Sequence, residues 1–375
     1  MTAGSRVLIV GGGIAGLSAA LSLRRAGVAV DVVEADRKWS VDDIGMIVHA
    51  NFIRAMAALG IAADTVAVGF PWDGASLEDG EGNLISRVHG VRLAGRAFPS
   101  DLGISRVALH KLLAGAVLAS GAQVRLGLTF SRIQQNDQRA TVTLSDGSVG
   151  TYDLVVGADG VHSKVREHVF GSQLQPQFTG QHRWRCKIRR RPDIDSPFVR
   201  VREDGTRYGY MPVSARSGCV MVLDCEPVDP NCPRERLPQL LRSRLARCTG
   251  KLAELRDEVA DPAHIVCRPI EVVFVQDTWY RGRVLLIGDA SHAMTAHLAQ
   301  GAAQAVEDGV VLGELFARGL PVPDLLEAFM FRRYARCKLI AETTLLTERS
   351  GHFTATVPDL ARVTEHMLAV AASPI

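Results

Sequence analysis

The stretch RVLIVGGGIAGLSAALSLRRAGVAVDVVE, residues 6–34, decides the fold. Residues 6–10 form a short apolar run that predicts a buried strand, and residues 15–26 carry apolar side chains at helical spacing and end at Gly27. Residues 28–34 predict a second strand. A strand, a glycine-rich loop, a helix and a parallel strand make up a right-handed βαβ unit. The sequence therefore predicts an α/β chain that begins with a Rossmann-like domain.

The loop of this unit, Gly11-Gly12-Gly13-Ile14-Ala15-Gly16, has the spacing of a dinucleotide-binding fingerprint. Gly11 permits the tight turn, Gly13 lets the backbone approach a phosphate, and Gly16 lets helix and strand pack closely. The helix N-terminus offers free N–H groups to a pyrophosphate, and Glu34 can accept hydrogen bonds from a ribose. A tight turn around no ligand is the alternative, and the fingerprint alone does not separate FAD from NAD. The predicted residues of this end are Gly11, Gly13, Ile14, Ala15, Gly16, Glu34 and Ala35.

The composition narrows the class of protein. Hydrophobic residues make up 47% of the 375 residues and charged residues 22%, as in ordinary globular proteins. A formal charge of +3 is too small for a dedicated nucleic-acid surface. The seven cysteines never form a Cys-x-x-Cys pair, and no apolar stretch is long enough to span a membrane. We therefore expect a cytoplasmic protein with reduced thiols, no metal site, and neither nucleic-acid nor membrane partners.

Two further strands lead into glycine turns. Residues 154–156 precede Gly157-Ala158-Asp159-Gly160, and residues 284–287 precede Gly288-Asp289. Because ligand-binding loops lie at the carboxyl ends of parallel strands, we expect these turns to converge with the first loop.

The rest of the chain has a different pattern of hydrophobic and polar residues. Residues 171–269 alternate in hydrophobicity and predict a mostly antiparallel sheet with one helix, 234–247, and the turn at 79–83 predicts strands added to that sheet. Beyond Gly301 the pattern is helical to about Leu346, with a break at 319–321. The predicted division is a cofactor domain of residues 1–72, 96–170 and 270–325, a substrate domain of 73–95 and 171–269, and a C-terminal helical segment of 326–375.

Two long motifs carry a family resemblance. Residues 153–166, DLVVGADGVHSKVR, resemble the Asp-Gly motif of class A FAD-dependent aromatic monooxygenases, the para-hydroxybenzoate hydroxylase-like enzymes. Residues 282–309, GRVLLIGDASHAMTAHLAQGAAQAVEDG, resemble their Gly-Asp motif, and the resemblance covers residues 5–345. The motifs are most similar to those of salicylate hydroxylase and of pyridine-ring hydroxylating members. The resemblance implies FAD as the cofactor and an FAD-binding Rossmann-like domain with an inserted antiparallel substrate domain and C-terminal helices.

The resemblance also implies roles for cofactor residues. Asp289 would accept a hydrogen bond from the ribityl chain, and Gly301 and Ala302 would direct helix N–H groups at the pyrimidine end of the flavin, where negative charge develops on reduction. Arg106 would reach the phosphates or the ribityl chain, and Asp159 would help to hold FAD. The alternatives are that Asp159 caps a helix and that Arg106 is a surface charge.

One position departs from the family pattern. Relatives usually carry a proline four residues after the histidine of the Gly-Asp motif, whereas here His292 is followed at that spacing by Ala296. A proline would stiffen the loop beside the flavin, so its loss puts in doubt how firmly this wall is set. Ala299, where many relatives have glycine, is shared by the salicylate and pyridine hydroxylating members.

In this class NADH or NADPH reduces FAD, oxygen adds at carbon 4a of the flavin, and the hydroperoxide hydroxylates an aromatic ring. No second glycine fingerprint is present for the nicotinamide donor, and the sequence does not decide between NADH and NADPH. The resemblance thus implies hydroxylation of a small aromatic or N-heteroaromatic acid such as salicylate, hydroxybenzoate, hydroxynicotinate or another pyridine carboxylate.

Four residues are candidates for substrate contact and catalysis: His49, Arg185, Tyr210 and His297. A histidine can take a phenolic proton near neutral pH, and an arginine can bind a carboxylate with two parallel hydrogen bonds. The alternative for each is a structural role, as a satisfied core histidine, a packed tyrosine or a solvated arginine.

Other functions on the same fold remain open. Flavin-dependent halogenases carry a Trp-x-Trp-x-Ile-Pro stretch, whereas residues 182–188 contain one tryptophan. A flavin dehydrogenase and a non-catalytic FAD-binding sensor are further alternatives. The helices after Gly301 could form a dimer face, so both a homodimer and a monomer are open.

Overall fold

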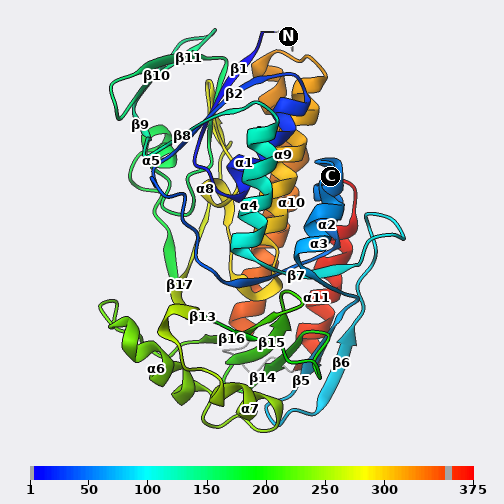
Figure 1. Ribbon diagram of the computed structural model, residues 1–375. Helices are drawn as coiled ribbons and strands as arrows, with labels where there is room; N and C mark the ends of the chain where they lie inside the picture. Colours follow the sequence, from blue (N-terminus) through cyan, green and yellow to red (C-terminus); the bar gives the residue numbers. More distant parts are fainter. Residues whose placement is uncertain (1–3, 351–356) are drawn as a thin grey trace.

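The structure is a computed structural model of the chain and describes residues 4–350 and 357–375. A six-stranded sheet with the order β18-β19-β12-β1-β2-β8 forms the centre of the upper half of the molecule (Figure 1). Its strands are β1 (Arg6–Val10), β2 (Ala29–Glu34), β8 (Gln123–Leu126), β12 (Leu154–Gly157), β18 (Tyr280–Arg281) and β19 (Val284–Leu286). All neighbours pair in parallel except β18 with β19. The predicted βαβ unit is confirmed. Strands β12 and β19, which lead into the two other glycine turns, lie beside β1 in the same parallel sheet, so the three turns follow neighbouring strands as expected.

Two helices pack on one another beside this sheet, namely α1 (Ile14–Arg25) and α9 (Gly301–Ala317). Two glycines on α9 allow the close approach: a Cβ on Gly309 would lie 2.6 Å from Ala19 N, and one on Gly313 would lie 2.1 Å from Ser22 Oγ. Helix α4 (Arg106–Ala119) packs against α1 from another side. The N-termini of α1 and α9 are thereby held at the same edge of the sheet.

A seven-stranded sheet with the order β17-β13-β16-β15-β14-β5-β6 forms the lower half (Figure 1). Its strands are β5 (Ala75–Glu78), β6 (Leu84–Val88), β13 (Gln177–Arg189), β14 (Phe198–Val201), β15 (Arg207–Pro212), β16 (Ser217–Asp224) and β17 (Ile265–Phe274). All pairs are antiparallel except β14 with β5. The expectation that the segment around residues 79–83 adds strands to this sheet is confirmed, and β17 spans the predicted domain boundary at 269–270.

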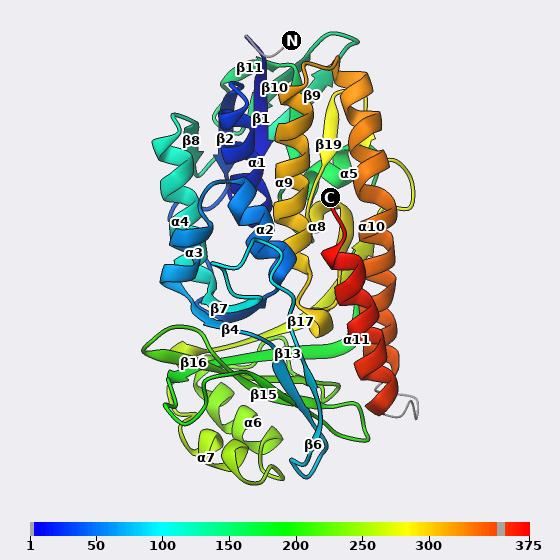
Figure 2. The same ribbon diagram turned by 90° about the vertical axis from the view of Figure 1, so that its right-hand side faces the viewer.

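The two faces of the lower sheet pack against different layers. Trp184, Tyr210 and Val222 face α6 (Leu237–Arg244) and α7 (Lys251–Asp257), which lie beneath the sheet in Figure 2. The helix predicted over 234–247 corresponds to a 3₁₀ turn and α6, which ends at Arg244, and α7 is a second helix that was not predicted. Met211 and Met221 lie on the other face, toward a small sheet with the order β3 (Gly45–Val48), β7 (Asp101–Ser105) and β4 (Phe70–Trp72).

Two long helices complete the fold. Helix α10 (Val322–Ser350) follows α9 after the predicted break and runs down toward the level of the lower sheet, and α11 (Val357–Ala372) runs back up beside it to the C-terminus (Figure 2). The other elements are β3 (Gly45–Val48), β4 (Phe70–Trp72), β7 (Asp101–Ser105), β9 (Phe130–Gln135), β10 (Ala140–Leu144), β11 (Val149–Tyr152), α2 (Ala50–Ala58), α3 (Ala62–Val68), α5 (Lys164–Phe170), α8 (Asp289–His292) and three 3₁₀ turns at Arg234–Arg236, Pro262–His264 and Ala296–Leu298. None of the described helices combines the length and apolar character needed to cross a membrane.

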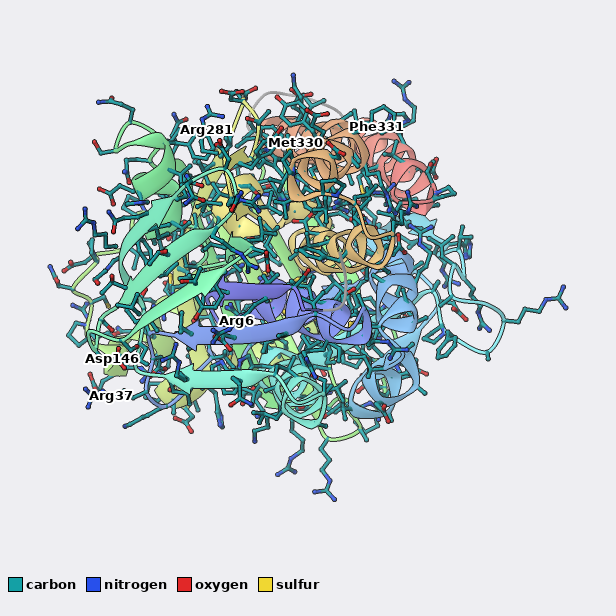
Figure 3. The ribbon with its side chains drawn as sticks, turned by 90° about the horizontal axis from the view of Figure 1, so that it is seen from above. Arg6, Arg37, Asp146, Arg281, Met330 and Phe331 are labelled. Carbon is teal, nitrogen blue, oxygen red and sulfur yellow. The ribbon has the colours of Figure 1, made fainter. Side chains whose placement is uncertain are left out.

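The amino ends of the central strands lie at the end of the molecule opposite the lower sheet. Figure 3 looks down on that end, where Arg6 marks the start of β1 and Asp146 the turn between β10 and β11. The carboxyl ends of β1, β12 and β19 therefore point inward, toward the lower sheet. That geometry places the glycine turns between the two halves of the molecule.

Candidate functional site

A cavity opens at the carboxyl ends of β1, β12 and β19, between the two halves of the molecule. Loops that follow these strands and the N-termini of α1 and α9 line it, as expected for a ligand site in a parallel sheet. The predicted cofactor residues in its lining are Gly13, Ile14, Ala15, Arg106, Asp289, Gly301 and Ala302. We call this space the cofactor cavity.

The glycines of the cofactor cavity divide into two kinds. A Cβ on Gly13 would meet no atom within 4 Å, and one on Gly301 would meet only Met294, at 4.0 Å. The backbone at these positions is therefore open to a bound group. By contrast, a Cβ on Gly11 would lie 2.4 Å from Ala158 O, and one on Gly16 would lie 2.0 Å from Gly11 O. Open backbone at two helix N-termini fits the pyrophosphate and pyrimidine ends of FAD.

Three side chains hold the middle of the glycine loop. Glu34 Oε2 accepts a hydrogen bond from Gly12 N at 2.8 Å, while the indole Nε1 of Trp39 donates to Gly12 O at 2.9 Å. The Nε2 atom of His110 lies 3.0 Å from the same carbonyl oxygen. Neither Glu34 nor the exposed Ala35 is among the residues lining the cofactor cavity. Sequence reasoning missed Trp39 and His110, because nothing in the local pattern joins them to Gly12.

The carboxylate of Asp159 caps a helix. It accepts hydrogen bonds from Ser163 Oγ and from Val165 N, the latter at 3.0 Å, at the start of α5. Burial raises the pKa of Asp159 above its ordinary value. Its neighbours Ala158 and Gly160 line the cofactor cavity, whereas Asp159 does not. The structure thus favours the helix-capping interpretation over direct contact with the cofactor.

A buried ion network stands behind the turn that carries Asp289. Asp308 Oδ2 accepts hydrogen bonds from Gly288 N at 2.8 Å and from His292 Nε2 at 2.7 Å, and Asp308 Oδ1 accepts one from Arg333 Nε at 2.7 Å. Burial opposes the charge on His292, but Cys337 and Asp308 raise its pKa well above the ordinary value. His292 therefore has a structural role in holding this turn.

The same cluster could be taken for a metal site, because His292, Asp308 and Cys337 offer ligand atoms within 4.8 Å of one another. However, the guanidinium of Arg333 already bonds Asp308 and contacts Cys337 Sγ at 3.2 Å. A cation in that position repels a metal ion, so we interpret the cluster as an ion-pair network.

A second cavity adjoins the cofactor cavity. Ile47, Arg185, Ala296 and Ala299 line both, so the two spaces share a wall. Three of the four predicted substrate residues, His49, Arg185 and His297, line the second cavity, which we call the substrate cavity. The remaining lining is mostly apolar and comes from the lower sheet, from α11 and from the 3₁₀ turn before α9: Ala75, Ser76, Leu77, Val88, Val199, Arg207, Met211, Met221, Leu223, Leu298 and Leu368.

His49 is held by a buried carboxylate. Its Nδ1 atom lies 2.6 Å from Asp101 Oδ1, and Asp101 Oδ2 in turn accepts hydrogen bonds from Ser100 Oγ at 2.6 Å and Gly74 N at 3.1 Å. Burial alone would raise the pKa of Asp101, but the hydrogen bond and charge of His49 bring it below its ordinary value. The pair is built like the histidine and carboxylate units that position a general base. Sequence reasoning found His49 and missed Asp101.

Arg185 brings a positive charge to the shared wall. Its Nη1 atom donates to Trp184 O at 3.0 Å, and none of the ion pairs within the described residues involves it. Burial lowers the pKa of Arg185 to about 10, so the guanidinium remains charged at neutral pH. A cation without an acidic partner in a partly desolvated wall favours an anionic ligand.

The prediction for Tyr210 needs correction. Tyr210 is fully buried on the face of the lower sheet that packs against α6 and α7, and its hydroxyl accepts a hydrogen bond from Arg191 N at 3.0 Å. Because side chains alternate along β15, the next residue, Met211, faces the substrate cavity instead.

Sequence reasoning also missed a second arginine. Arg207 lines the substrate cavity, is 6% exposed, and donates from Nη2 to Thr347 O at 2.6 Å. Burial lowers its pKa to about 10. The many arginines between residues 183 and 207 gave no sign of which ones face inward.

The loop with the unusual alanines forms part of the shared wall. Ala296 begins the 3₁₀ turn Ala296–Leu298, and Ala299, which follows it, has φ 51° and ψ 32°. This left-handed conformation explains why glycine suits the position, since alanine is strained there.

The comparison with protein families agrees with this geometry. The sequence profile of the FAD binding domain family matches residues 4–344. The chain therefore belongs to this family and is an FAD-dependent monooxygenase of the aromatic hydroxylase type.

Individual relatives align along nearly the whole chain. It is 30% identical to the 2-heptyl-3-hydroxy-4(1H)-quinolone synthase of Pseudomonas aeruginosa, covering 92% of this chain and 90% of that protein. It is 27% identical to the FAD-dependent urate hydroxylase of Klebsiella pneumoniae, covering 89% and 87%. Among solved structures, that of Klebsiella pneumoniae HpxO complexed with FAD and uric acid has a TM-score of 0.88 at 25% identity, covering 100% of this chain and 98% of that chain.

Proposed function

We propose that this protein uses NADH or NADPH and O2 to hydroxylate an aromatic or N-heteroaromatic ring that carries an acidic group. One observation carries the proposal: the cofactor and substrate cavities share a wall, and Arg185 lines both while His49 and His297 line the second. Bound FAD would supply the acceptance of electrons from the nicotinamide and the activation of oxygen. The ring would lie on the other side of the shared wall.

The chain's own residues prepare the ring. His49, oriented by Asp101, accepts a proton from a ring hydroxyl or ring N–H, which makes the ring electron-rich. Arg185 stabilises the resulting anion or a carboxylate on the ring. His297, whose Nδ1 lies 3.1 Å from Thr295 Oγ1, faces the ring from the loop before α9. The apolar residues of the lining exclude water from the reacting atoms.

The names of the relatives support a nitrogen-containing ring. By their names, one of these proteins makes a quinolone and the other hydroxylates urate, and both compounds contain fused N-heterocyclic rings. We therefore favour pyridine-type and fused N-heteroaromatic acids over salicylate and hydroxybenzoate as substrates of this chain. None of the seven cysteines, all of which the structure describes, forms a disulfide bond, which suits a reducing compartment such as the cytoplasm.

A screen of ring compounds tests the proposal. The purified protein, loaded with FAD, is mixed with NADH or NADPH and with hydroxynicotinate, 4-quinolones, urate, salicylate or 4-hydroxybenzoate. We expect at least one ring to accelerate NAD(P)H oxidation and to gain the mass of one oxygen atom. A protein that binds FAD and these rings, yet consumes no more NAD(P)H in their presence, would be a sensor rather than a hydroxylase.

A further inference from the structure

The substrate cavity has two chemically different ends. The end beside the cofactor cavity carries Arg185 and is lined by Ala296 and Ala299. The far end is lined from the edge strands β5 and β6 and from α11, where Leu77, Val88 and Leu368 lie with Ala75 and Ser76. Arg207 lines the same cavity from β15, which lies between the strand of Arg185 and these edge strands in the sheet. Leu77, Val88 and Leu368 cannot form hydrogen bonds, so a polar group placed among them would lose its hydrogen bonds to water without replacement. We call these three residues the outer wall.

Helix α11 is held in place by two arginines at its C-terminal end. Arg54 donates to Ala372 O at 2.9 Å and to Ser373 O at 3.0 Å, while Arg336 donates to Ala371 O at 2.7 Å and to Val370 O at 2.9 Å. The last carbonyls of a helix have no partner within the helix, and cations are favourable at this end. The arginines therefore fix the position of α11 along its own axis.

Both arginines are anchored to the flavin side of the molecule. Glu307, fully buried on α9, accepts hydrogen bonds from Arg336 at 2.9 and 3.0 Å and lies 3.8 Å from Arg54. Met367 of α11 also packs against Leu298, in the loop that follows His297. Helix α11 is thus joined to the same helix whose N-terminus lines the cofactor cavity, and Leu368 is a fixed wall.

We propose that the outer wall receives an apolar substituent on the substrate ring, and that Leu368 sets how long this substituent can be. The inference rests on the proposed function and adds the substrate class: a ring with its acidic atoms at Arg185 and His49 and an alkyl or alkenyl chain directed toward β5, β6 and α11. Each methylene that the outer wall buries strengthens binding roughly fourfold. Affinity should rise with chain length until the chain meets Leu368.

Binding of two homologous series tests this inference. The probes are 2-alkyl-4-quinolones and 4-alkylsalicylates with chains from methyl to nonyl, and the dissociation constant is measured from the change in flavin absorbance or fluorescence of the FAD-loaded protein. We expect affinity in at least one series to rise roughly fourfold per carbon up to an optimum length. The same affinity at every length, or no binding in either series, would overturn the inference.

Variants of α11 test whether Leu368 sets the maximum chain length of the substituent. Leu368→Trp should shift the optimum to shorter chains, and Leu368→Ala should shift it to longer chains. Ala369→Trp is the matched control, since it introduces the same tryptophan side chain at the next residue of α11, which is exposed. An optimum that stays in place in both Leu368 variants, or that moves equally in the control, would contradict the role of Leu368. If Leu368→Trp does not fold, Leu368→Ala alone decides.

The two proposals can fail separately. Chain-length-dependent binding without stimulated NAD(P)H oxidation would refute hydroxylation of these rings and leave the outer wall as a ligand site. Hydroxylation of small unsubstituted rings, with binding indifferent to chain length, would support the proposed function and refute the outer wall.

Discussion

The cofactor cavity and the substrate cavity share a wall but are built in different ways. The cofactor cavity is lined to a large extent by glycine turns and helix N-termini, each of which belongs to one continuous sequence motif. The substrate cavity is made of side chains from β5, β6, β14, β15, β16 and α11, which lie far apart in the sequence. FAD presents the same pyrophosphate and ring in every relative, whereas the substrate varies. Local motifs thus suit the constant ligand and dispersed side chains suit the variable one.

The largest expected effect is the loss of FAD binding in a variant of the cofactor cavity that keeps its fold. Gly13 is the N-cap of α1 and its Cβ would meet no atom within 4 Å, so Gly13→Asp places a favoured capping residue there. Its negative charge would oppose the pyrophosphate, and we expect FAD affinity to fall by about 100-fold or more. The FAD content of the purified protein measures the effect. Gly13→Asn, which caps equally well without charge, is the control, and an equal loss in both variants would show that bulk rather than charge is responsible.

The next effect acts on the substrate cavity and leaves the cofactor in place. His49→Gln removes the group that we propose as the base, so hydroxylation should slow by about 100-fold while FAD content is unchanged. Asp101→Asn should slow it as well and alter the dependence of kcat on pH, because the amide cannot hold the same imidazole tautomer. Steady-state rates from mildly acidic to mildly alkaline pH measure both. The exposed His89→Gln is the control. Wild-type rates in His49→Gln would remove His49 from the mechanism.

A smaller effect concerns the network behind the Gly288 turn. Because the pKa of His292 is raised in the folded protein, its protonation stabilises the fold fully below the ordinary pKa of 6.5, and this stabilisation is lost as the pH rises through the folded pKa. We expect the free energy of unfolding to fall as the pH rises through that range. Urea unfolding at several pH values measures it. His292→Gln should flatten the slope, and an equal slope in the variant would contradict the assignment.

The smallest effect concerns the wall that the two cavities share. Ala299→Gly removes the left-handed strain at φ 51° but gives the unfolded chain more freedom, so we expect a gain of about 0.5 kcal/mol in the free energy of unfolding. Ala303→Gly, within the right-handed helix α9, should instead destabilise by about 1 kcal/mol. Thermal unfolding of both variants measures the difference. Destabilisation by Ala299→Gly would show that its methyl group packs usefully in the wall.

The contrast between the cavities also explains what the sequence could predict. The first strand, the glycine loop and the first helix lie within residues 6–25, where periodicity and glycine spacing act over a few residues, and β1 and α1 lie where they were expected. The break between α9 and α10 was also visible locally, because glycine and proline stand there. These features depend on short-range chemistry.

The substrate cavity depends on contacts that are not local. Side chains alternate along β15, so Tyr210 and Met211 must point to opposite faces of the sheet. Every residue of this strand is buried, so the sequence offers no polar face that would tell which of the two faces the cofactor domain. The pairing of His49 with Asp101 spans 52 positions, and Leu368 reaches the cavity from α11, which Arg54, Arg336 and the packing of Met367 on Leu298 hold in place. Chain topology decides such contacts, and no local pattern records them.

Oxygen labelling tests the central claim most directly, namely that a flavin in the cofactor cavity delivers oxygen to a ring in the substrate cavity. The FAD-loaded protein is supplied with NAD(P)H, isotopically labelled O2 and the ring that most strongly stimulates NAD(P)H oxidation, and the product is analysed by mass spectrometry. We predict one labelled oxygen atom in each hydroxylated ring. A product that carries unlabelled oxygen from water, or release of all the oxygen as hydrogen peroxide with the ring unchanged, would contradict it.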